Sequence, residues 1–191
     1  MKQIVLASAS PRRKELLEKV GLSFKVEPSS FAENLSTGME PNTLAREISL
    51  GKAKSVAHKY PDAIIIGADT FVIVGNRIMG KPDTADEARE MLRNLSDRYH
   101  SVITGFSIID TLSGKVVSQT VETKVYIKQL TSREIDAYVK SGEPLDKAGA
   151  YAIQGLGALL VERIEGDYCN VIGLPLFALM KALKEFGIYI L

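Results

Sequence analysis

The chain opens with an apolar run that changes into a capped helix within a few residues. Ile4 to Ala7 is apolar throughout and predicts a buried strand. Ser10 and Pro11 then predict a helix start, because serine is a favoured N-cap and proline has no N–H to leave unsatisfied in the first turn. Gly21 predicts the end of this helix. A second strand is expected at Phe24 to Glu27.

The next predicted helix, Asn42 to Lys59, carries a lysine at the centre of its apolar face. A turn of about 100° per residue places Leu44, Ile48 and Val56 on the same face as Lys52. Burying an ammonium group without a partner is costly. Two interpretations therefore stand: the side chain snorkels to the edge of the apolar stripe, or it points into a cleft and meets an anionic ligand.

The strongest strand signal is Ala63 to Val74, in which Asp69 interrupts two apolar runs. Strands disfavour aspartate, and an unpaired buried carboxylate is costly. Asp69 either caps a local turn or is a carboxylate that holds a metal or activates water at the end of a central strand, and we favour the second interpretation. Gly75-Asn76 predicts a two-residue hairpin turn before a short strand at 77–79.

The second half of the chain predicts capped helices and longer strands. Thr84-x-x-Glu87 and Thr131-x-x-Glu134 have the spacing of capping boxes. Strands are expected at 101–110, 116–130 and 158–164, and a last helix at 175–186. The strand at 116–130 alternates between apolar and polar residues, which predicts an antiparallel strand with one wet face. His100 is predicted to be a surface residue at a strand end.

The segment Asp146 to Gly157 is rich in glycine and alanine and includes Lys147, Tyr151 and Gln154. Its glycines allow the backbone to approach something closely, either a ligand or a neighbouring element. The spacing is not G-x-G-x-x-G, so the segment carries no dinucleotide-binding prediction.

Composition limits the classes of protein that fit. A chain of 191 residues that is 46% hydrophobic suffices for one core over residues 1–191, or for two tightly joined lobes. A net charge of +1 provides no general attraction for nucleic acid or an anionic membrane. A single cysteine, Cys169, excludes an intrachain disulfide and fits a reducing compartment. No apolar run is long enough to cross a bilayer, so we expect a cytoplasmic protein.

Two arginines follow the first predicted helix start, where the positive end of the helix dipole disfavours cations. Arg12 and Arg13 lie in the first turn, near the hydroxyls of Ser8 and Ser10. Free backbone N–H groups, hydroxyls and guanidiniums together suit an anion such as phosphate. Isolated cations and acids recur in the chain at 12, 13, 33, 52, 69, 81 and 147. This set predicts an α/β protein that acts on a phosphorylated small molecule, with carboxylates available for a divalent metal.

Six motifs occur in the order and spacing of the Maf family of nucleoside triphosphate pyrophosphatases, and the chain resembles that family over essentially its whole length. The motifs are Leu-Ala-Ser-Ala-Ser-Pro-Arg-Arg-Lys-Glu-Leu, Gly-Ala-Asp-Thr, Gly-Lys-Pro, Asp-Lys-Ala-Gly-Ala-Tyr, Ile-Gln-Gly-Leu-Gly and Gly-Leu-Pro. The resemblance implies an α/β fold of two lobes around a long curved mixed sheet, with the nucleotide in the cleft between the lobes. It also implies a divalent cation, Mg²⁺ or Mn²⁺, and cleavage between the α- and β-phosphates.

The resemblance also assigns expected roles to individual residues. Asp69 is similar to the family's proton acceptor, and Asp69 and Glu33 are the expected metal ligands. The polar cluster around triphosphate and metal is expected to include Ser8, Arg13, Glu33, Lys52 and Lys81. Arg12, Thr70 and Gln154 resemble the subgroup that hydrolyses dTTP and UTP, with modified pyrimidine nucleotides as further candidate substrates. The chain departs from the family pattern at Ala32, where an acid often precedes the equivalent of Glu33.

Two other functions use similar residues. Family members are linked to arrest of septum formation, so the chain is alternatively a regulatory protein that senses nucleotides with little catalysis. A nucleotide or sugar-phosphate transferase would use the same cations but pass phosphorus to an acceptor other than water. The expected partner is a nucleoside triphosphate, without nucleic acid or membrane, and a homodimer is a family-level expectation.

Overall fold

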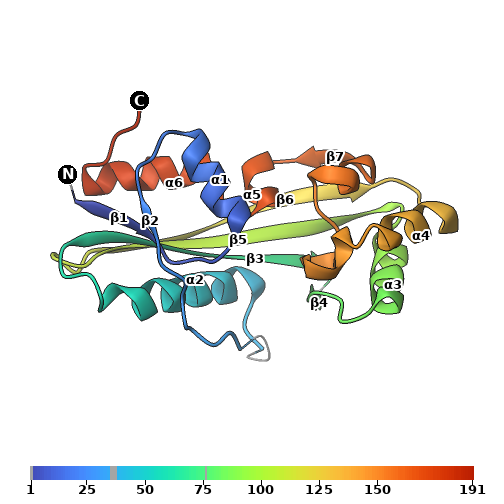
Figure 1. The fold of residues 1–191 in the computed structure, drawn as a ribbon, viewed down its shortest axis with the longest axis horizontal. Coiled ribbons are helices and arrows are strands. Elements are labelled where there is room, and N and C mark those ends of the chain that lie inside the picture. The colour runs from blue at the N-terminus through green and yellow to red at the C-terminus, as the bar shows by residue number, and fades with distance from the viewer. Residues whose placement is uncertain (1, 35–37, 76) are drawn as a thin grey trace. The chain divides into compact units, whose positions relative to one another are not determined.

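A computed structural model describes residues 2–34, 38–75 and 77–191. Within these residues a seven-stranded sheet has the order β2-β1-β3-β5-β6-β7, and β4 pairs with β3 (Figure 1). The strands are β1 (Gln3–Leu6), β2 (Lys25–Val26), β3 (Ala63–Val74), β4 (Arg77–Met79), β5 (Arg98–Asp110), β6 (Val116–Ile127) and β7 (Val161–Glu165). The sheet mixes parallel and antiparallel pairs, which confirms the α/β class.

Helices lie between most of these strands along the chain, but β4 follows β3 directly and β6 follows β5 directly. The α-helices are α1 (Pro11–Lys19), α2 (Pro41–Ala57), α3 (Ala85–Leu95), α4 (Ser132–Lys140), α5 (Tyr168–Ile172) and α6 (Leu176–Leu183). The short 3₁₀ helices are η1 (Glu143–Asp146), η2 (Ala148–Ala150), η3 (Gly155–Leu159) and η4 (Lys184–Phe186). Among the described residues, no helix is long and apolar enough to cross a membrane.

The chain divides into two compact units, which we describe separately. Unit 1 consists of residues 1–70, 104–121 and 173–191, apart from those outside the described ranges. Unit 2 consists of residues 71–103 and 122–172, with the same restriction. Strands β3, β5 and β6 contribute residues to both units, so the units are not two consecutive domains of the sequence.

Unit 1 is built on the parallel strands β2, β1 and β3. Leu6 in β1 pairs with Val26 in β2 and with Ile66 in β3. The chain passes from β1 through α1 to β2 on one side, and then through α2 to β3 on the other. Helix α2 covers one face of these strands, while α1 and α6 cover the opposite face (Figure 1). The connections from β1 and from β2 therefore run in opposite directions across the sheet, with β1 between β2 and β3. Open α/β sheets bind ligands beyond the carboxyl ends of the strands at such a switch point.

Two glycines let α2 lie unusually close to the strands of unit 1. A Cβ atom at Gly67 in β3 would lie 2.3 Å from the backbone carbonyl oxygen of Ser49. A Cβ atom at Gly105 in β5 would lie 2.2 Å from the carbonyl oxygen of Ala45. Any larger residue would push the helix outward, so these two glycines fix how near the side chains of α2 come to β3.

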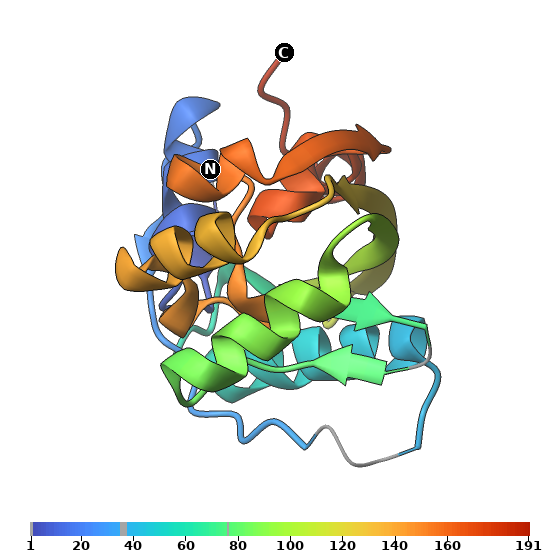
Figure 2. The same cartoon turned by 90° about the vertical axis from the view of Figure 1, so that its right-hand side faces the viewer.

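Unit 2 has its own apolar core, formed by strand residues and by the helices α3 and α4. Figure 2 shows α3 and α4 side by side. Their buried residues include Leu92, Leu95, Ile135 and Val139, which pack with Val125 from β6 in one cluster. Strands β3 and β4 pair antiparallel, as the hairpin prediction requires. The predicted turn residue Asn76 lies outside the described residues.

The two predicted capping boxes have different outcomes. At α4 the Thr131 hydroxyl accepts from the Glu134 N–H, and the Glu134 carboxylate accepts from the Thr131 N–H, so this box is confirmed. At α3 the Thr84 hydroxyl accepts from the Glu87 N–H, but the Glu87 carboxylate accepts from the N–H of Asp83 instead. At α3 the predicted hydrogen bond from the Thr84 N–H to the Glu87 carboxylate is therefore wrong.

The prediction that His100 lies on the surface was wrong. Its side chain in β5 is 4% exposed, and Nε2 lies 2.7 Å from the hydroxyl of Tyr151. The two rings meet edge to face at a centroid distance of 5.2 Å. Burial lowers the pKa of His100 to about 4, because the charged imidazolium would lose its hydration.

Acid should therefore destabilise unit 2 through His100. The unfolded chain takes up a proton at this histidine below about pH 6.5, whereas the folded chain does not until about pH 4. The free energy of unfolding should fall as pH is lowered through that window, by up to about 3 kcal/mol. Urea unfolding of the wild type and His100→Gln at pH 7 and pH 4.5 measures the effect. The wild type should lose more stability than the variant, and equal losses would contradict the assignment.

Candidate active site

The candidate site begins where β3 continues past the end of β1. The last paired residues are Leu6 and Ile66, and the N–H of Ala7 then donates to the Ile66 carbonyl. Strand β3 runs on to Val74, so Asp69 lies within the strand. The prediction that Asp69 lies at the end of a central strand was wrong. Its position beyond the carboxyl end of β1 is nevertheless the place where a parallel sheet of this order binds ligands.

Lys52 joins the two acidic residues of the site. Its Nζ atom lies 2.6 Å from Oδ1 of Asp69 and 2.6 Å from Oε1 of Glu33. Residues two apart in a strand share a face, so Asp69 points to the same side as Gly67, against which α2 is packed. The Lys52 side chain is only 12% exposed. Lys52 is therefore a buried cation with acidic partners from this chain and not a snorkelling side chain, while its contact with an anionic ligand stays a prediction.

A loop anchored on α2 brings Glu33 to Lys52. The hydroxyls of Ser29 and Ser55 lie 2.7 Å apart. The ring of Phe31 occupies the space above Gly51, where a Cβ atom would lie 2.4 Å from the ring. Glycine inside a helix costs about 1 kcal/mol relative to alanine, so Gly51 was the sequence signal for this contact, and we missed it.

Arg13 is buried near the start of α1, and its guanidinium group bonds to three neutral oxygens. Nε donates to the carbonyl of Gly173 at 2.8 Å, and Nη1 donates to the Ser8 hydroxyl at 3.1 Å. Nη2 donates to the hydroxyl of Thr70 at 3.1 Å. Because these partners carry no charge, they orient Arg13 without neutralising it. The positive charge of the guanidinium group therefore remains able to attract an anion.

Thr104 in β5 extends this network. Its hydroxyl lies 2.9 Å from that of Thr70, and its side chain is fully buried. Thr70 was expected to influence base preference; in the structure its hydroxyl contacts Arg13, which gives it a second role as a support for that cation. No sequence motif includes Thr104, so its place in the site was not predicted. Gly173 belongs to the Gly-Leu-Pro motif, which indicated no role for it.

Burial sets the protonation of this cluster. It raises the pKa of Asp69, although the positive charges of Lys52 and Arg13 oppose the shift. Burial also lowers the pKa of Arg13, opposed chiefly by the charge of Asp69. A carboxyl group whose pKa is raised binds a proton more readily than an ordinary aspartate, as a general base requires.

The acidic residues suit a divalent metal that is shared with phosphate. Glu33 and Asp69 both face the Lys52 ammonium, so their oxygens converge on one point. The described residues contain no group of three or more His, Cys, Asp or Glu side chains that would form a protein-only metal cage. Mg²⁺ commonly takes one or two carboxylates and completes its shell with water and substrate phosphates. Two convergent carboxylates are therefore a sufficient set of protein ligands.

The remaining predicted residues have various environments. Arg12 is half-buried beside Arg13 in the first turn of α1. Lys81 and Gln154 belong to unit 2, where Lys81 is exposed and Gln154 is half-buried. The carbonyl of Gly80 accepts from the N–H of Gly149 at 2.9 Å, which ties the loop before Lys81 to the glycine-rich segment. The contacts of these three residues with a nucleotide stay predictions.

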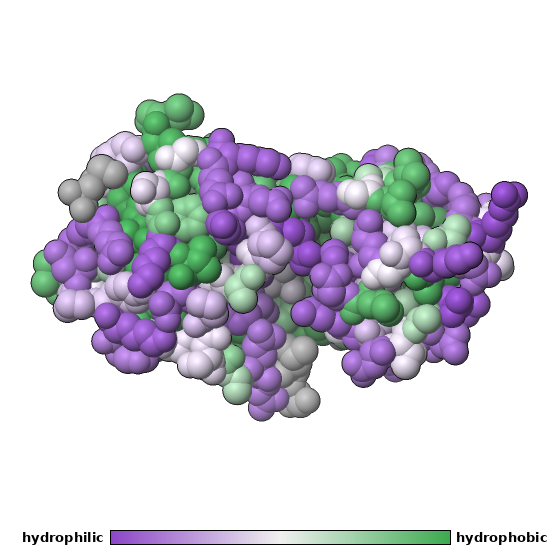
Figure 3. Space-filling model, viewed as in Figure 1, coloured by the Kyte–Doolittle hydropathy of each residue, from purple (hydrophilic) through white to green (hydrophobic). Residues whose placement is uncertain are grey.

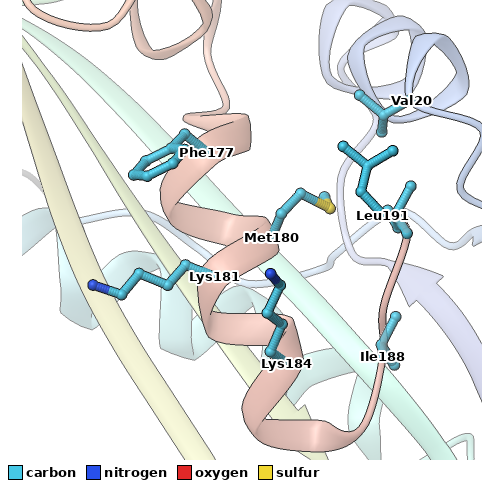
Figure 4. Close-up of a pocket in the computed structure, with 8 residues that line it drawn as sticks. Val20, Phe177, Met180, Lys181, Lys184, Ile188 and Leu191 are labelled. Carbon is cyan, nitrogen blue, oxygen red and sulfur yellow. The ribbon is translucent and has the colours of Figure 1, made fainter.

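A pocket elsewhere in unit 1 has a different chemistry. It encloses about 440 Å³ beside α6 and the C-terminal segment (Figure 4). The C-terminal end that borders it is hydrophobic in Figure 3. Its lining consists of Val20, Phe177, Met180, Lys181, Lys184, Ile188, Ile190 and Leu191. None of these side chains is a carboxylate that could hold a metal-bound triphosphate, so we place the candidate site at Asp69.

The fold and the site define an α/β protein with a buried carboxylate–lysine–arginine cluster at a ligand-binding position of its sheet, an arrangement that suits a phosphorylated ligand. Residues 3–186 match the model of the family described as Maf-like protein. The chain belongs to this family, which confirms the resemblance.

Curated relatives match over nearly the whole chain. A dTTP/UTP pyrophosphatase of Methanococcoides burtonii is 54% identical over 191 residues, covering 100% of this chain and 98% of the relative. A protein of the same name from Methanosarcina barkeri is 48% identical, covering 100% of this chain and 97% of the relative. Another from Thermoanaerobacter sp. is 51% identical, covering 99% of this chain and 100% of the relative. The solved structure of a Staphylococcus aureus Ham1 protein aligns at a TM-score of 0.47 with 14% identity, covering 66% of this chain and 72% of that one.

Removing the Lys52 charge should raise the pKa of Asp69 further. The Lys52 ammonium opposes the effect of burial, so Lys52→Met, which keeps an unbranched apolar stem, should leave Asp69 harder to ionise. Carbon-13 NMR titration of the Asp69 carboxyl group measures this directly. Lys54→Met, at an exposed position of the same helix, is the matched control and should leave the titration unchanged. An Asp69 pKa that stayed the same or fell in Lys52→Met would contradict the ion pair.

Proposed function

We propose that this chain hydrolyses dTTP and UTP to the nucleoside monophosphate and pyrophosphate. The names of relatives that are about half identical over the full length support this substrate class. The observation that carries the proposal is the buried Asp69 carboxylate held beside the cations Lys52 and Arg13. A protein that only sensed nucleotides would need the cations but would have no use for a base of raised pKa.

The side chains of unit 1 divide the reaction between them. Asp69 accepts a proton from a water molecule as the water oxygen bonds to the α-phosphorus. The bond between the α-phosphorus and the bridging oxygen then breaks, and pyrophosphate leaves with that electron pair. Arg13 and Lys52 face the developing negative charge, and Ser8 and Thr70 hold Arg13 in position. Water is consumed, and no oxidant or second substrate is needed.

A divalent cation, Mg²⁺ or Mn²⁺, completes the proposed site. Asp69 and Glu33 would hold it, because their carboxylates converge at Lys52. Such an ion neutralises phosphate charge and makes a bound water more acidic. The Lys52 ammonium, which faces the same two carboxylates, would attract the phosphates that share the site.

Lys81 and Gln154 complete the proposed set of recognition residues. Lys81 would contact the phosphates. Gln154 would read the base, because a carboxamide both donates and accepts and so matches the carbonyl and N–H edge of a pyrimidine. Arg12 and Thr70 are further proposed specificity residues. Location in the cytoplasm and assembly as a homodimer remain expectations.

The products and the base preference test the proposed function together. Incubation of the wild type and Asp69→Asn with dTTP, UTP, ATP, GTP and 7-methyl-GTP in Mg²⁺ or Mn²⁺, with separation of the phosphate products, gives both. We expect monophosphate and pyrophosphate, a clear preference for dTTP and UTP, and loss of activity with EDTA. Asp69→Asn should lower turnover about 10²-fold or more. Release of orthophosphate and a nucleoside diphosphate would contradict the proposal. Equal rates on all five nucleotides would contradict it as well.

A further inference from the structure

Two side chains hold the backbone on both sides of Gln154. The hydroxyl of Tyr138 accepts from the N–H of Ala152 at 3.2 Å. The carboxylate of Glu143 accepts from the N–H of Leu156 at 3.1 Å and from the N–H of Gly157 at 3.0 Å. The held positions are two residues before Gln154 and two and three residues after it. Gln154 therefore lies at the middle of a short segment fixed at both ends.

The two anchoring side chains are themselves joined. The Tyr138 hydroxyl donates to Oε1 of Glu143 at 2.9 Å. Tyr138 is buried on α4, and Glu143 is the first residue of η1, so both start from regular structure. Bonds from backbone N–H groups to a carboxylate are charge-assisted and stronger than bonds between neutral groups. The loop is thus tied to the helical part of unit 2.

The glycines of the loop fit these anchors. Gly155 has a φ of +66°, and a Cβ atom there would lie 2.6 Å from Oε2 of Glu143. A Cβ atom at Gly157 would lie 2.2 Å from the carbonyl oxygen of Ala152 and 2.6 Å from the Tyr138 hydroxyl. The sequence left open whether these glycines serve a ligand or a neighbouring element. In the structure Gly155 and Gly157 make room for Glu143 and Tyr138.

We propose that Glu143 and Tyr138 are a positioning pair that sets the base preference of the enzyme through Gln154. This inference rests on the proposed function and assigns no contact with the nucleotide to either residue. A carboxamide discriminates between bases only if its donor and acceptor stand opposite the matching groups of the ring. Sites of that kind reject analogues that leave their polar groups unpaired, and small displacements of the reading group weaken the rejection.

Two conservative variants disturb the anchors differently. Glu143→Gln keeps the size but replaces one acceptor oxygen by an NH₂ group, which repels a backbone N–H. Tyr138→Phe keeps the ring and removes the hydroxyl that serves both Ala152 and Glu143. Glu90→Gln, an exposed acid on α3 of the same unit, is the matched control. Each variant is compared with Gln154→Ala and with the double variant Glu143→Gln/Gln154→Ala.

The decisive quantity is the ratio of kcat/KM for dTTP to kcat/KM for ATP, measured with the thermal midpoint of each protein. Glu143→Gln and Tyr138→Phe should each lower the ratio about tenfold, mainly through a higher KM for dTTP, while Glu90→Gln leaves it unchanged. Because Glu143 acts through Gln154, the double variant should have the same ratio as Gln154→Ala alone.

The outcomes separate the inference from the proposed function. A wild type without any preference for dTTP would overturn the proposed function and remove the basis of the inference. In a second outcome the wild type prefers dTTP, Gln154→Ala loses this preference, and both Glu143→Gln and Tyr138→Phe keep it. That outcome would overturn the inference and leave the proposed function standing. A double variant whose effects simply add would also overturn the inference, because Glu143 would then act independently of Gln154. If one anchor variant does not fold, the other still decides.

Discussion

The arrangement of unit 1 depends on keeping a carboxylate charged inside a buried strand. Asp69 lies among apolar residues of β3, where ionisation loses the hydration of the charge. Lys52 at 2.6 Å and the charge of Arg13 offset that loss only in part, since the pKa of Asp69 is still raised. Removing either partner of a buried ion pair usually costs more than the pair contributes, so the cations and the acid are tied to one another.

This requirement explains several features of the backbone. Helix α2 must approach β3 closely for Lys52 to reach Asp69, and Gly67 permits that approach two residues away on the same face. Strand β1 must end early for the side chains beyond Ile66 to remain accessible to a ligand. Arg13 lies in the first turn of α1, which a short loop joins to that end, and its three neutral partners hold it in place without cancelling its charge.

The sequence predicted the parts of this arrangement that depend on local pattern. Hydrophobic runs located β1 and β3, and Ser10-Pro11 located the start of α1, because these signals act over a few residues. For Lys52 the pattern showed an anomaly but not its partner, since Glu33 and Asp69 come from two other segments. Thr104 and the buried His100 were missed for a similar reason. Polar residues in strands look solvent-exposed until the element that covers them is known.

The central claim is that water activated at Asp69 attacks the α-phosphorus of a nucleoside triphosphate. Hydrolysis of dTTP in water enriched in oxygen-18, followed by mass spectrometry of both products, tests it most directly. If the claim holds, one labelled oxygen appears in the nucleoside monophosphate and none in pyrophosphate. Label in pyrophosphate would place the attack on the β-phosphorus and contradict the mechanism.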